Sequence, residues 1–258
     1  MGIFFESYQV KVCCLCGSDE ALTGEHKIKA SALRKIFGKD RMVIGSFNGE
    51  SIVRPAQGPK SEAFHFTARM CSTCNGARTQ AADREFDRFH ALVSARLLKG
   101  EDPSSVFDLP QYEIGSEAYL NVFRYFSKLL CCHVAESSGP RPLDVSRFAI
   151  GAVDRNVVWL RIDADPTYQA FRVAHGEHKY AAHGGLIVPV DSTTRRPTSF
   201  ISSISLGAVR YRFWTNLLPI SGEALRWFHR AFWDKCQAAH KDAVENPLSD
   251  KQNRRLGV

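Results

Sequence analysis

Two pairs of cysteines, separated by a long intervening segment, constrain the fold of this chain more than any other feature. Cys13 and Cys16 form one C-x-x-C pair, and Cys71 and Cys74 form another. Two such pairs present four thiolates at the spacing typical of tetrahedral zinc sites. Because four protein ligands leave no open position for water, the zinc is expected to be structural and to join the ends of a segment of about 60 residues.

Four further cysteines lie outside these pairs. Cys14 could replace Cys13 only by shortening the spacing to C-x-C, so Cys13 is the expected ligand. The other three, Cys131, Cys132 and Cys236, lie on helical stripes among aromatic residues and are predicted to be small buried apolar side chains. Unliganded or oxidised cysteines are the alternative to a zinc site. The metal-ligand spacing and the lack of a signal sequence favour thiolates that bind metal.

Composition predicts a folded protein with a preference for polyanions. Hydrophobic residues make up 44% of the 258 residues, with 17 Phe and 4 Trp, which excludes the composition of a disordered chain. The formal net charge of +7 favours nucleic acid as a partner. The positive excess is shared between residues 1–90 and the rest without a basic block, so charge alone does not identify the partner.

Nothing in the sequence predicts membrane insertion. No apolar run reaches the roughly 18 residues that a membrane-spanning helix requires. The opening residues lack both a basic region and a small-residue cleavage site. We therefore expect a cytoplasmic protein with no membrane partner.

The first part of the chain contains one strongly predicted helix. Residues 8–17 alternate and then reach the first cysteine pair and Gly17, which predicts a short strand entering a tight turn. Residues 64–70 alternate aromatic and polar side chains ahead of the second pair. Apolar residues then recur at intervals of three and four, which predicts a helix over 76–99; they are Ala82, Phe86, Phe89, Val93 and Leu97.

A Pro-, Gly- and Ser-rich stretch near 100–115 predicts a boundary between two units, 1–103 and 112–247. The second unit is expected to be α+β with a mostly antiparallel sheet. A helix is predicted over 116–135, and short strands are predicted over 147–153, 156–162, 168–174, 184–190 and 199–206. A last helix is predicted over 222–244 with Ser221 as N-cap, followed by a frayed tail after Pro247.

The role of the second unit stays open. His175, His178 and His183 lie close together, but no carboxylate or cysteine pattern accompanies them, so they are predicted to be exposed or hydrogen-bonded and not metal ligands. Residues 209–216 alternate arginine with aromatic side chains. This pattern suits stacking on nucleic acid and equally suits an ordinary amphipathic strand.

An acidic residue and a histidine lie together between the two cysteine pairs. Glu25 immediately precedes His26, and Asn75 directly follows the last cysteine at the start of the predicted helix. The order C-x-x-C, Glu-His, C-x-x-C-Asn resembles the HNH endonucleases of the zinc-clamped ββα-metal type. The resemblance covers about residues 10–90 and implies an N-terminal ββα-metal module with a structural zinc.

The resemblance implies specific roles for three residues. His26 would be the general base, and its type suits that role because the usual histidine pKa of about 6.5 leaves a neutral fraction at neutral pH. Glu25 would be a ligand of the catalytic cation, and Asn75 a second one. Two hard oxygen ligands favour Mg²⁺ or Mn²⁺ over a catalytic zinc. For Asn75, N-capping of the helix is the alternative role.

The chain also departs from the family pattern. Glu25 stands where Asp is commoner, and no Asn precedes the second cysteine pair to orient the base; His65 is the nearest polar candidate. Thr79 and Asp83 share a helix face with Asn75 and are further candidate cation ligands. Five basic residues could contact phosphates or form a solvated surface; they are Lys27, Lys29, Arg78, Arg84 and Arg88.

These features together predict a metal-dependent HNH endonuclease that hydrolyses phosphodiester bonds. Double-stranded DNA is the expected substrate, and the layout suits bacterial or phage restriction and defence. The second unit would select substrate, or bind a protein partner or a second copy of the chain. Two alternatives remain: a catalytically inactive zinc-clamped module that binds nucleic acid or acts as an adaptor, and a nuclease directed at RNA.

Overall fold

A six-stranded sheet lies at the centre of this computed structural model, which describes residues 4–38, 42–46, 54–56, 62–175 and 180–247. The strands are β1 (Phe5–Glu6), β2 (Leu22–His26), β3 (Met42–Ser46), β4 (Arg54–Ala56), β5 (His65–Cys71), β6 (Arg141–Pro142), β7 (Trp159–Ala164), β8 (Tyr180–His183), β9 (Ser199–Leu206) and β10 (Val209–Asn216). The helices are α1 (Ala30–Phe37), α2 (Gln80–Leu98), α3 (Glu117–Glu136), α4 (Leu143–Ala149), α5 (Pro166–His175), α6 (Pro219–Phe228) and α7 (Arg230–Glu245).

The strand order of the large sheet is β4-β3-β8-β9-β10-β7. Neighbouring strands pair antiparallel except for β3 and β8, which are parallel. Gly207 adopts a positive φ of 55° in the tight turn between β9 and β10, a conformation that glycine adopts without steric cost. The described chain is therefore mixed α+β with antiparallel sheets, as the sequence predicts.

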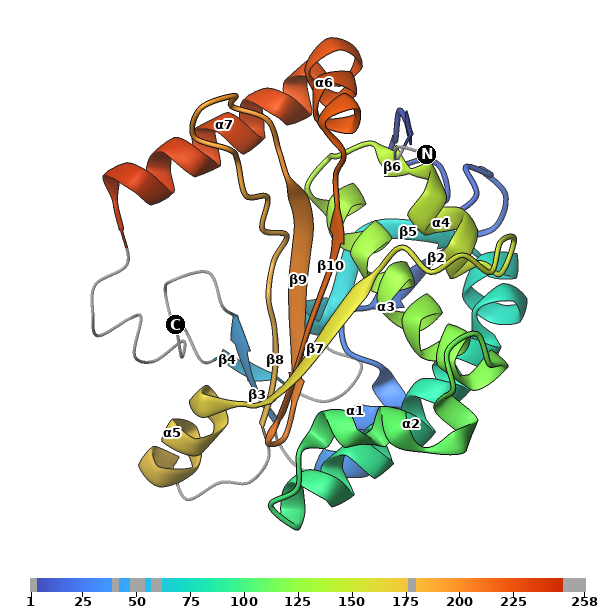
Figure 1. Ribbon diagram of the computed structural model, residues 1–258, viewed down its shortest axis with the longest axis vertical. Helices are drawn as coiled ribbons and strands as arrows, with labels where there is room; N and C mark the ends of the chain where they lie inside the picture. The colour runs from blue at the N-terminus through green and yellow to red at the C-terminus, as the bar shows by residue number, and fades with distance from the viewer. Residues whose placement is uncertain (1–3, 39–41, 47–53, 57–61, 176–179, 248–258) are drawn as a thin grey trace.

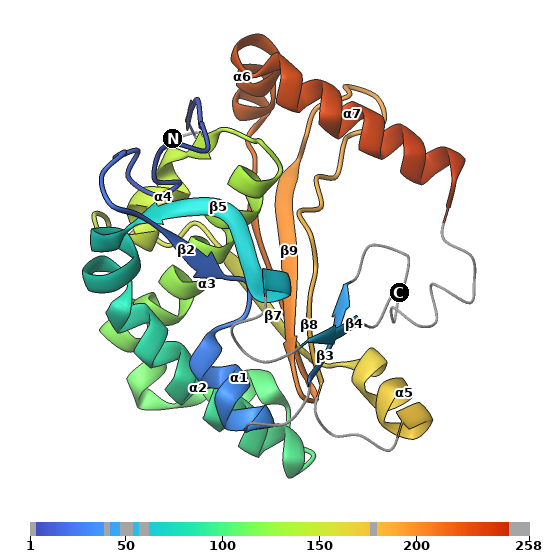
Figure 2. The same ribbon diagram turned by 180° about the vertical axis from the view of Figure 1, so that it is seen from behind.

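Helix α3 is buried along nearly its whole length and holds the core together. Its central residues Val122 to Ala135 include few that reach solvent, as expected of a helix that is apolar on all sides. It packs against α2 and α4, against β5, and against β9 and β10 of the large sheet (Figures 1 and 2). The Tyr125 ring stacks on Phe86 of α2 with centroids 3.9 Å apart. Ser116 caps the helix by accepting a hydrogen bond from the Tyr119 amide.

A second, two-stranded sheet lies beside α3 and leads into α2. Strands β2 and β5 pair antiparallel, with Leu22 opposite Cys71 and His26 opposite His65. The chain then turns through a short π-helical segment, Cys74–Arg78, before α2 begins. Strand β2 carries the Glu25-His26 pair, and Cys71 and Cys74 lie at the end of β5 and the start of the helical segment, whereas Cys13 and Cys16 lie in the turns before β2. Figure 2 shows β2 and β5 side by side.

The helices predicted over 76–99 and 116–135 are confirmed as α2 with its π-helical start and as α3. The strands predicted over 156–162 and 199–206 correspond to β7 and β9, and residues 209–216 form β10. Residues 8–17 form turns and not a strand, and residues 184–190 form only isolated bridges at Ile187 and Val190. The tail after Pro247 lies outside the described residues.

Two predicted strands are helices. Residues 147–153 overlap α4, whose Val145, Phe148 and Ala149 are buried at helical spacing. Residues 168–174 lie in α5, which buries Tyr168 and Phe171 three positions apart. Its start is marked by Asp165, which accepts a hydrogen bond from the Thr167 amide at 2.7 Å, and by Pro166 in the first turn.

The single helix predicted over 222–244 is two helices, α6 and α7. His229 interrupts it with φ −133° and ψ 49°, outside the helical region. The first helix begins earlier than predicted, with Leu218 at the N-cap position and Pro219 in the first turn. Ser221 is buried within α6 and does not cap it.

Both predicted units contribute to the same core. Strands β3 and β4 of the first unit complete the sheet made by β7 to β10 of the second. One cluster of buried side chains includes residues from both, such as Phe86, Phe126 and Phe213. The division into 1–103 and 112–247 stays a prediction for a truncation experiment. No helix in the described ranges is long and apolar enough to cross a membrane.

Candidate functional site

The four paired cysteines gather at one point. The Sγ atoms of Cys13, Cys16, Cys71 and Cys74 all lie within 4.8 Å of one another, a grouping that could hold a zinc ion. The Cys16 and Cys71 sulfurs are 3.6 Å apart, close to the roughly 3.8 Å that tetrahedral Zn–S bonds of about 2.3 Å impose. The set therefore fits a structural zinc.

The backbone of the two turns already favours thiolates. The Cys74 amide donates to the Cys71 sulfur at 3.4 Å. A hydrogen bond with the Cys74 thiol lowers the pKa of Cys13 to about 4, and the same contact raises the pKa of Cys74. The two thiols thus share one proton, which zinc binding would release. Gly17 closes the first turn with φ 80°, where a Cβ would lie 2.9 Å from the Arg141 guanidinium.

Cys14 lies outside this cluster, as the spacing predicts. Its sulfur is 3.6 Å from that of Cys132 on α3, so Cys14 connects the turn that contains the first cysteine pair to the buried helix. Cys131, Cys132 and Cys236 are all buried, as predicted. Among the described residues, the four-cysteine set is the one group of three or more His, Cys, Asp or Glu ligand atoms close enough to hold a metal.

Strand β2 carries Glu25 and His26 at an irregularity in its pairing with β5. Gly24 pairs with Arg69 and His26 with His65, so Glu25 alone faces residues 66–68. Such bulges redirect side chains away from regular alternation. The His26 and His65 rings lie 3.9 Å apart between centroids with their planes tilted by 44°. The predicted base and the nearest polar candidate are therefore in contact.

Asn75 ties the start of the helical segment to β2. Its Nδ2 donates to the Thr23 hydroxyl at 2.9 Å and to the Gly24 carbonyl at 3.0 Å. The helical segment already begins at Cys74, with Thr73 in the N-cap position, so Asn75 does not cap it. Asn75 therefore contacts the residue that directly precedes Glu25. Its amide oxygen can still accept a hydrogen bond or bind a cation.

Two carboxylates converge on one buried ammonium group. Lys128 of α3 places its Nζ 2.8 Å from Glu25 Oε1 and 2.6 Å from Asp83 Oδ1. The Lys128 side chain is only 1% exposed. Burial alone would lower the pKa of Lys128, but the charges of Glu25 and Asp83 outweigh it and raise that pKa above its usual value. Lys128 is therefore a charged ammonium shared by β2 and α2.

A second lysine extends the network toward α1. Lys29 donates to the Asp83 carbonyl and pairs with the Asp87 carboxylate at 2.5 Å. The Tyr125 hydroxyl is buried and has no hydrogen-bond partner among the described residues. Burial raises the pKa of Tyr125, and the charges of Lys128, Asp83 and Glu25 also act on it. The ring of Tyr125 lies 5.3 Å from the Lys128 ammonium, measured to its centroid.

Chemically, the convergence of Glu25 and Asp83 fits a cation. The Lys128 ammonium occupies the point where both carboxylates meet and stands in for a positive ion there. Carboxylate oxygens are ligands that Mg²⁺ and Mn²⁺ prefer.

The remaining predicted residues are less closely involved. The Thr79 hydroxyl donates to the Cys74 carbonyl at 2.9 Å, so it serves the helical segment. Three of the five basic residues are paired: Lys27 with Glu136, Lys29 with Asp87 and Arg88 with Glu85. Arg78 lies 3.8 Å from the Cys74 sulfur, and Arg84 is exposed.

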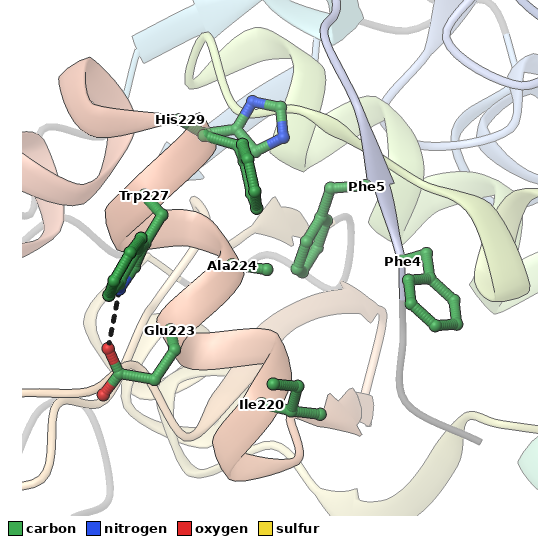
Figure 3. A pocket seen from close by; sticks show the side chains of 8 residues that line it. Phe4, Phe5, Ile220, Glu223, Ala224, Trp227 and His229 are labelled. Atoms are coloured by element: carbon green, nitrogen blue, oxygen red, sulfur yellow. Dashed lines mark hydrogen bonds between the residues drawn. The ribbon is translucent and has the colours of Figure 1, made fainter.

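The histidines of the second half do not join this site. The Nδ1 atom of His183 is hydrogen-bonded to the Gly184 carbonyl oxygen at 3.3 Å, and burial lowers the pKa of His183 to about 4. The side chains of His175 and His178 lie outside the described residues. Figure 3 shows a separate apolar pocket between β1 and α6, lined by Phe4, Phe5, Ile220 and Trp227, with Glu223 hydrogen-bonded to the Trp227 indole. Glu223 and His229 also line it, and no hydrogen bond or ion pair joins these two among the described residues.

Sequence reasoning missed Lys128. Its signal was a lysine within the apolar run Tyr125 to Leu130, in the middle of a helix where a solvated charge has no place. A buried lysine requires a carboxylate partner, which sequence spacing could not identify.

No protein-family model, no curated protein and no solved structure matches this chain.

Proposed function

We propose that this protein is a metal-dependent endonuclease of the HNH type, with a zinc-clamped ββα-metal site formed by β2, β5 and the helical segment that continues into α2. The observation that carries the proposal is the convergence of Glu25 and Asp83 on one cation, next to His26 on the same strand. The four-cysteine group supports it, because it joins both ends of this unit.

In this proposal, Glu25 and Asp83 hold the divalent cation, with the Asn75 amide oxygen as a third donor. When bound, such a cation neutralises charge on the transition state and on the leaving oxygen. His26 takes the proton from the attacking water. Contact with the His65 ring limits the rotation of His26 and takes the place of the orienting Asn that the family pattern has before the second cysteine pair.

Asn75 has a further, positioning role in the proposal. Its two hydrogen bonds to β2 fix the strand against the helical segment. Because Gly24 immediately precedes Glu25, these bonds also fix the carboxylate relative to Asp83. The zinc clamp acts over a longer range, since it holds β5 and the turn after it to the N-terminal turn.

DNA is the proposed substrate, in a cytoplasmic restriction or defence role in a bacterium or phage. The net charge of +7 supports a polyanionic substrate without distinguishing DNA from RNA. Arg69 is exposed on β5 opposite Gly24 and Arg84 is exposed on α2, so both are candidates for phosphate contact beside the site.

One observation favours a second candidate function. The Lys128 ammonium already pairs with both Glu25 and Asp83. A chain in which this pairing is permanent would bind nucleic acid without cutting it and would act as a zinc-clamped adaptor.

The test is incubation of the purified, zinc-loaded protein with supercoiled plasmid and with structured RNA, in Mg²⁺, Mn²⁺ or EDTA. The endonuclease proposal expects nicked or linear plasmid in the presence of a divalent cation and none in EDTA. Cleavage of RNA alone would transfer the proposal to an RNA nuclease. Binding of nucleic acid without cleavage under every cation would favour the adaptor.

A further inference from the structure

Lys128 is the most unusual charged residue in the described chain. Its side chain is 1% exposed, and it comes from α3, which lies outside the segment that carries the cysteine pairs and the Glu25-His26 pair. Leu129 and Leu130 directly after it on the helix are fully buried, and its ammonium lies 5.3 Å from the centroid of the Tyr125 ring. The charge of the ammonium is therefore stabilised by the two carboxylates and not by water.

Both partners of the ammonium are proposed cation ligands. Glu25 and Asp83 come from β2 and α2, and each approaches Nζ to hydrogen-bond distance. Removing a lysine from such a place would leave two buried or half-buried carboxylates close together without a counterion. The two carboxylates consequently need a cation at this point, which the chain itself supplies.

We propose that the Lys128 ammonium and a divalent cation compete for Glu25 and Asp83, so that Lys128 holds the site in a metal-free state until the cation displaces it. This inference rests on the proposed function, because it takes these two carboxylates as the cation site. A single positive charge between two carboxylates leaves one negative charge in excess, whereas a divalent cation balances both. The competition sets the cation concentration at which the site fills.

The competition makes a clear difference between two lysines. Lys128→Met removes the internal competitor and keeps the length of the side chain. Lys27→Met is the matched control, since Lys27 pairs with Glu136 at 3.0 Å and contacts neither Glu25 nor Asp83. Lys128→Gln is a second variant for the case in which methionine prevents folding, because its amide can still donate to a carboxylate without a charge.

The experiment measures Mn²⁺ binding to the zinc-loaded proteins by titration calorimetry and by the loss of the free-Mn²⁺ signal in electron paramagnetic resonance. We expect Lys128→Met and Lys128→Gln to bind Mn²⁺ at least about tenfold more tightly than the wild type, which corresponds to about 1.4 kcal/mol. Lys27→Met should stay within about twofold of the wild type. Adding Glu25→Gln to Lys128→Met should remove the gain.

The outcomes separate the inference from the proposed function. Equal Mn²⁺ affinity in the wild type and both Lys128 variants, at one site that Glu25→Gln abolishes, would overturn the competition and leave the cation site intact. No Mn²⁺ binding to any folded, zinc-loaded protein would overturn both. Tighter binding in the Lys128 variants alone, lost again with Glu25→Gln, supports the competition whether or not the protein cleaves nucleic acid.

Discussion

Lys128 Nζ lies 2.8 Å from Glu25 Oε1, although the two residues come from α3 and β2, far apart in the sequence. Together with Asp83, this contact joins the zinc-clamped strands to the buried helix of the core. The proposed cation ligands all lie before the predicted boundary near 100–115, but the ammonium that pairs with two of them comes from beyond it. The electrostatics of the site depend on a residue outside the segment that resembles the family.

Zinc content tests the cysteine cluster. We expect about one zinc per chain by elemental analysis, and Cys71→Ser should lose the metal and unfold the part of the chain between the two pairs. The matched control is Cys14→Ser, because Cys14 contacts Cys132 and is not part of the cluster. Zinc loss in Cys14→Ser with retention in Cys13→Ser would reverse the assignment of the first ligand.

Substitution of Lys128 should lower the stability of the protein strongly when no free divalent cation is present. Lys128→Met should lower the free energy of unfolding by about 3–5 kcal/mol, because it leaves two carboxylates without their buried partner. Lys241→Met on α7 removes the same charge from an exposed pair with Glu245 and should cost less than about 1 kcal/mol. Urea denaturation of the zinc-loaded proteins, in buffer without free divalent cations, measures both. Equal effects of the two substitutions would place Lys128 in solvent.

Asn75 distinguishes a positioning role from simple ligation. Asn75→Asp supplies a better cation ligand but replaces the donating amide by an oxygen that faces the Gly24 carbonyl and the Thr23 hydroxyl. We therefore expect Asn75→Asp to lower the cleavage rate at saturating Mn²⁺ and to lower the melting temperature, as Asn75→Ala does. A rise in activity with unchanged stability would mean that ligation outweighs the contacts with β2.

Acid should destabilise the fold through buried histidines. His90, bonded to the Tyr211 hydroxyl at 2.8 Å, and His183 both have pKa values lowered to about 4, chiefly by burial. Because the unfolded chain binds these protons near the usual pKa of about 6.5 and the folded chain only near 4, each histidine lowers the stability as the pH falls from about 6.5 toward 4. The slope approaches about 1.4 kcal/mol per pH unit for each group.

Denaturation curves between pH 7 and pH 4 measure this dependence. His90→Gln should reduce the slope by one group, since glutamine can still bond to Tyr211 and takes up no proton. His240→Gln on α7 is the control for the histidine-to-glutamine change itself, because His240 is only half-buried. An identical slope in His90→Gln and the wild type would contradict the assignment.

Local patterns predicted the parts of the fold in which sequence spacing and structure coincide. The two C-x-x-C pairs predicted the cysteine cluster because one zinc ion needs ligands from both pairs, although the pairs lie far apart in the chain. The spacing from Ala82 to Leu97 predicted α2 because helical periodicity depends on residues close together in the chain. The sequence also contains the helix start at Asp165 and Pro166, but the turn signals that flank residues 168–174 favour a short strand. Similarly, the break at His229 has no proline or glycine to mark it.

The long-range part of the site could not be predicted in this way. The pairing of β3 with β8 and the contact of Lys128 with Glu25 join segments whose separation follows no fixed period. Sequence spacing placed Asp83 on the same face as Asn75, yet it gave no reason to choose Asp83 over Thr79. The contacts in the structure favour Asp83, because its carboxylate pairs with the Lys128 ammonium, whereas the Thr79 hydroxyl donates to the Cys74 carbonyl.

The most direct test of the proposed function is the rate of plasmid cleavage by His26→Ala relative to the wild type, with both proteins zinc-loaded and with His240→Ala as control. Loss of a positioned base should reduce cleavage by about 10²–10⁴-fold at every Mn²⁺ concentration, with zinc content and melting temperature unchanged. Glu25→Ala should instead recover part of its activity at high Mn²⁺, because it weakens binding of the cation. Equal cleavage by His26→Ala and the wild type would contradict the account.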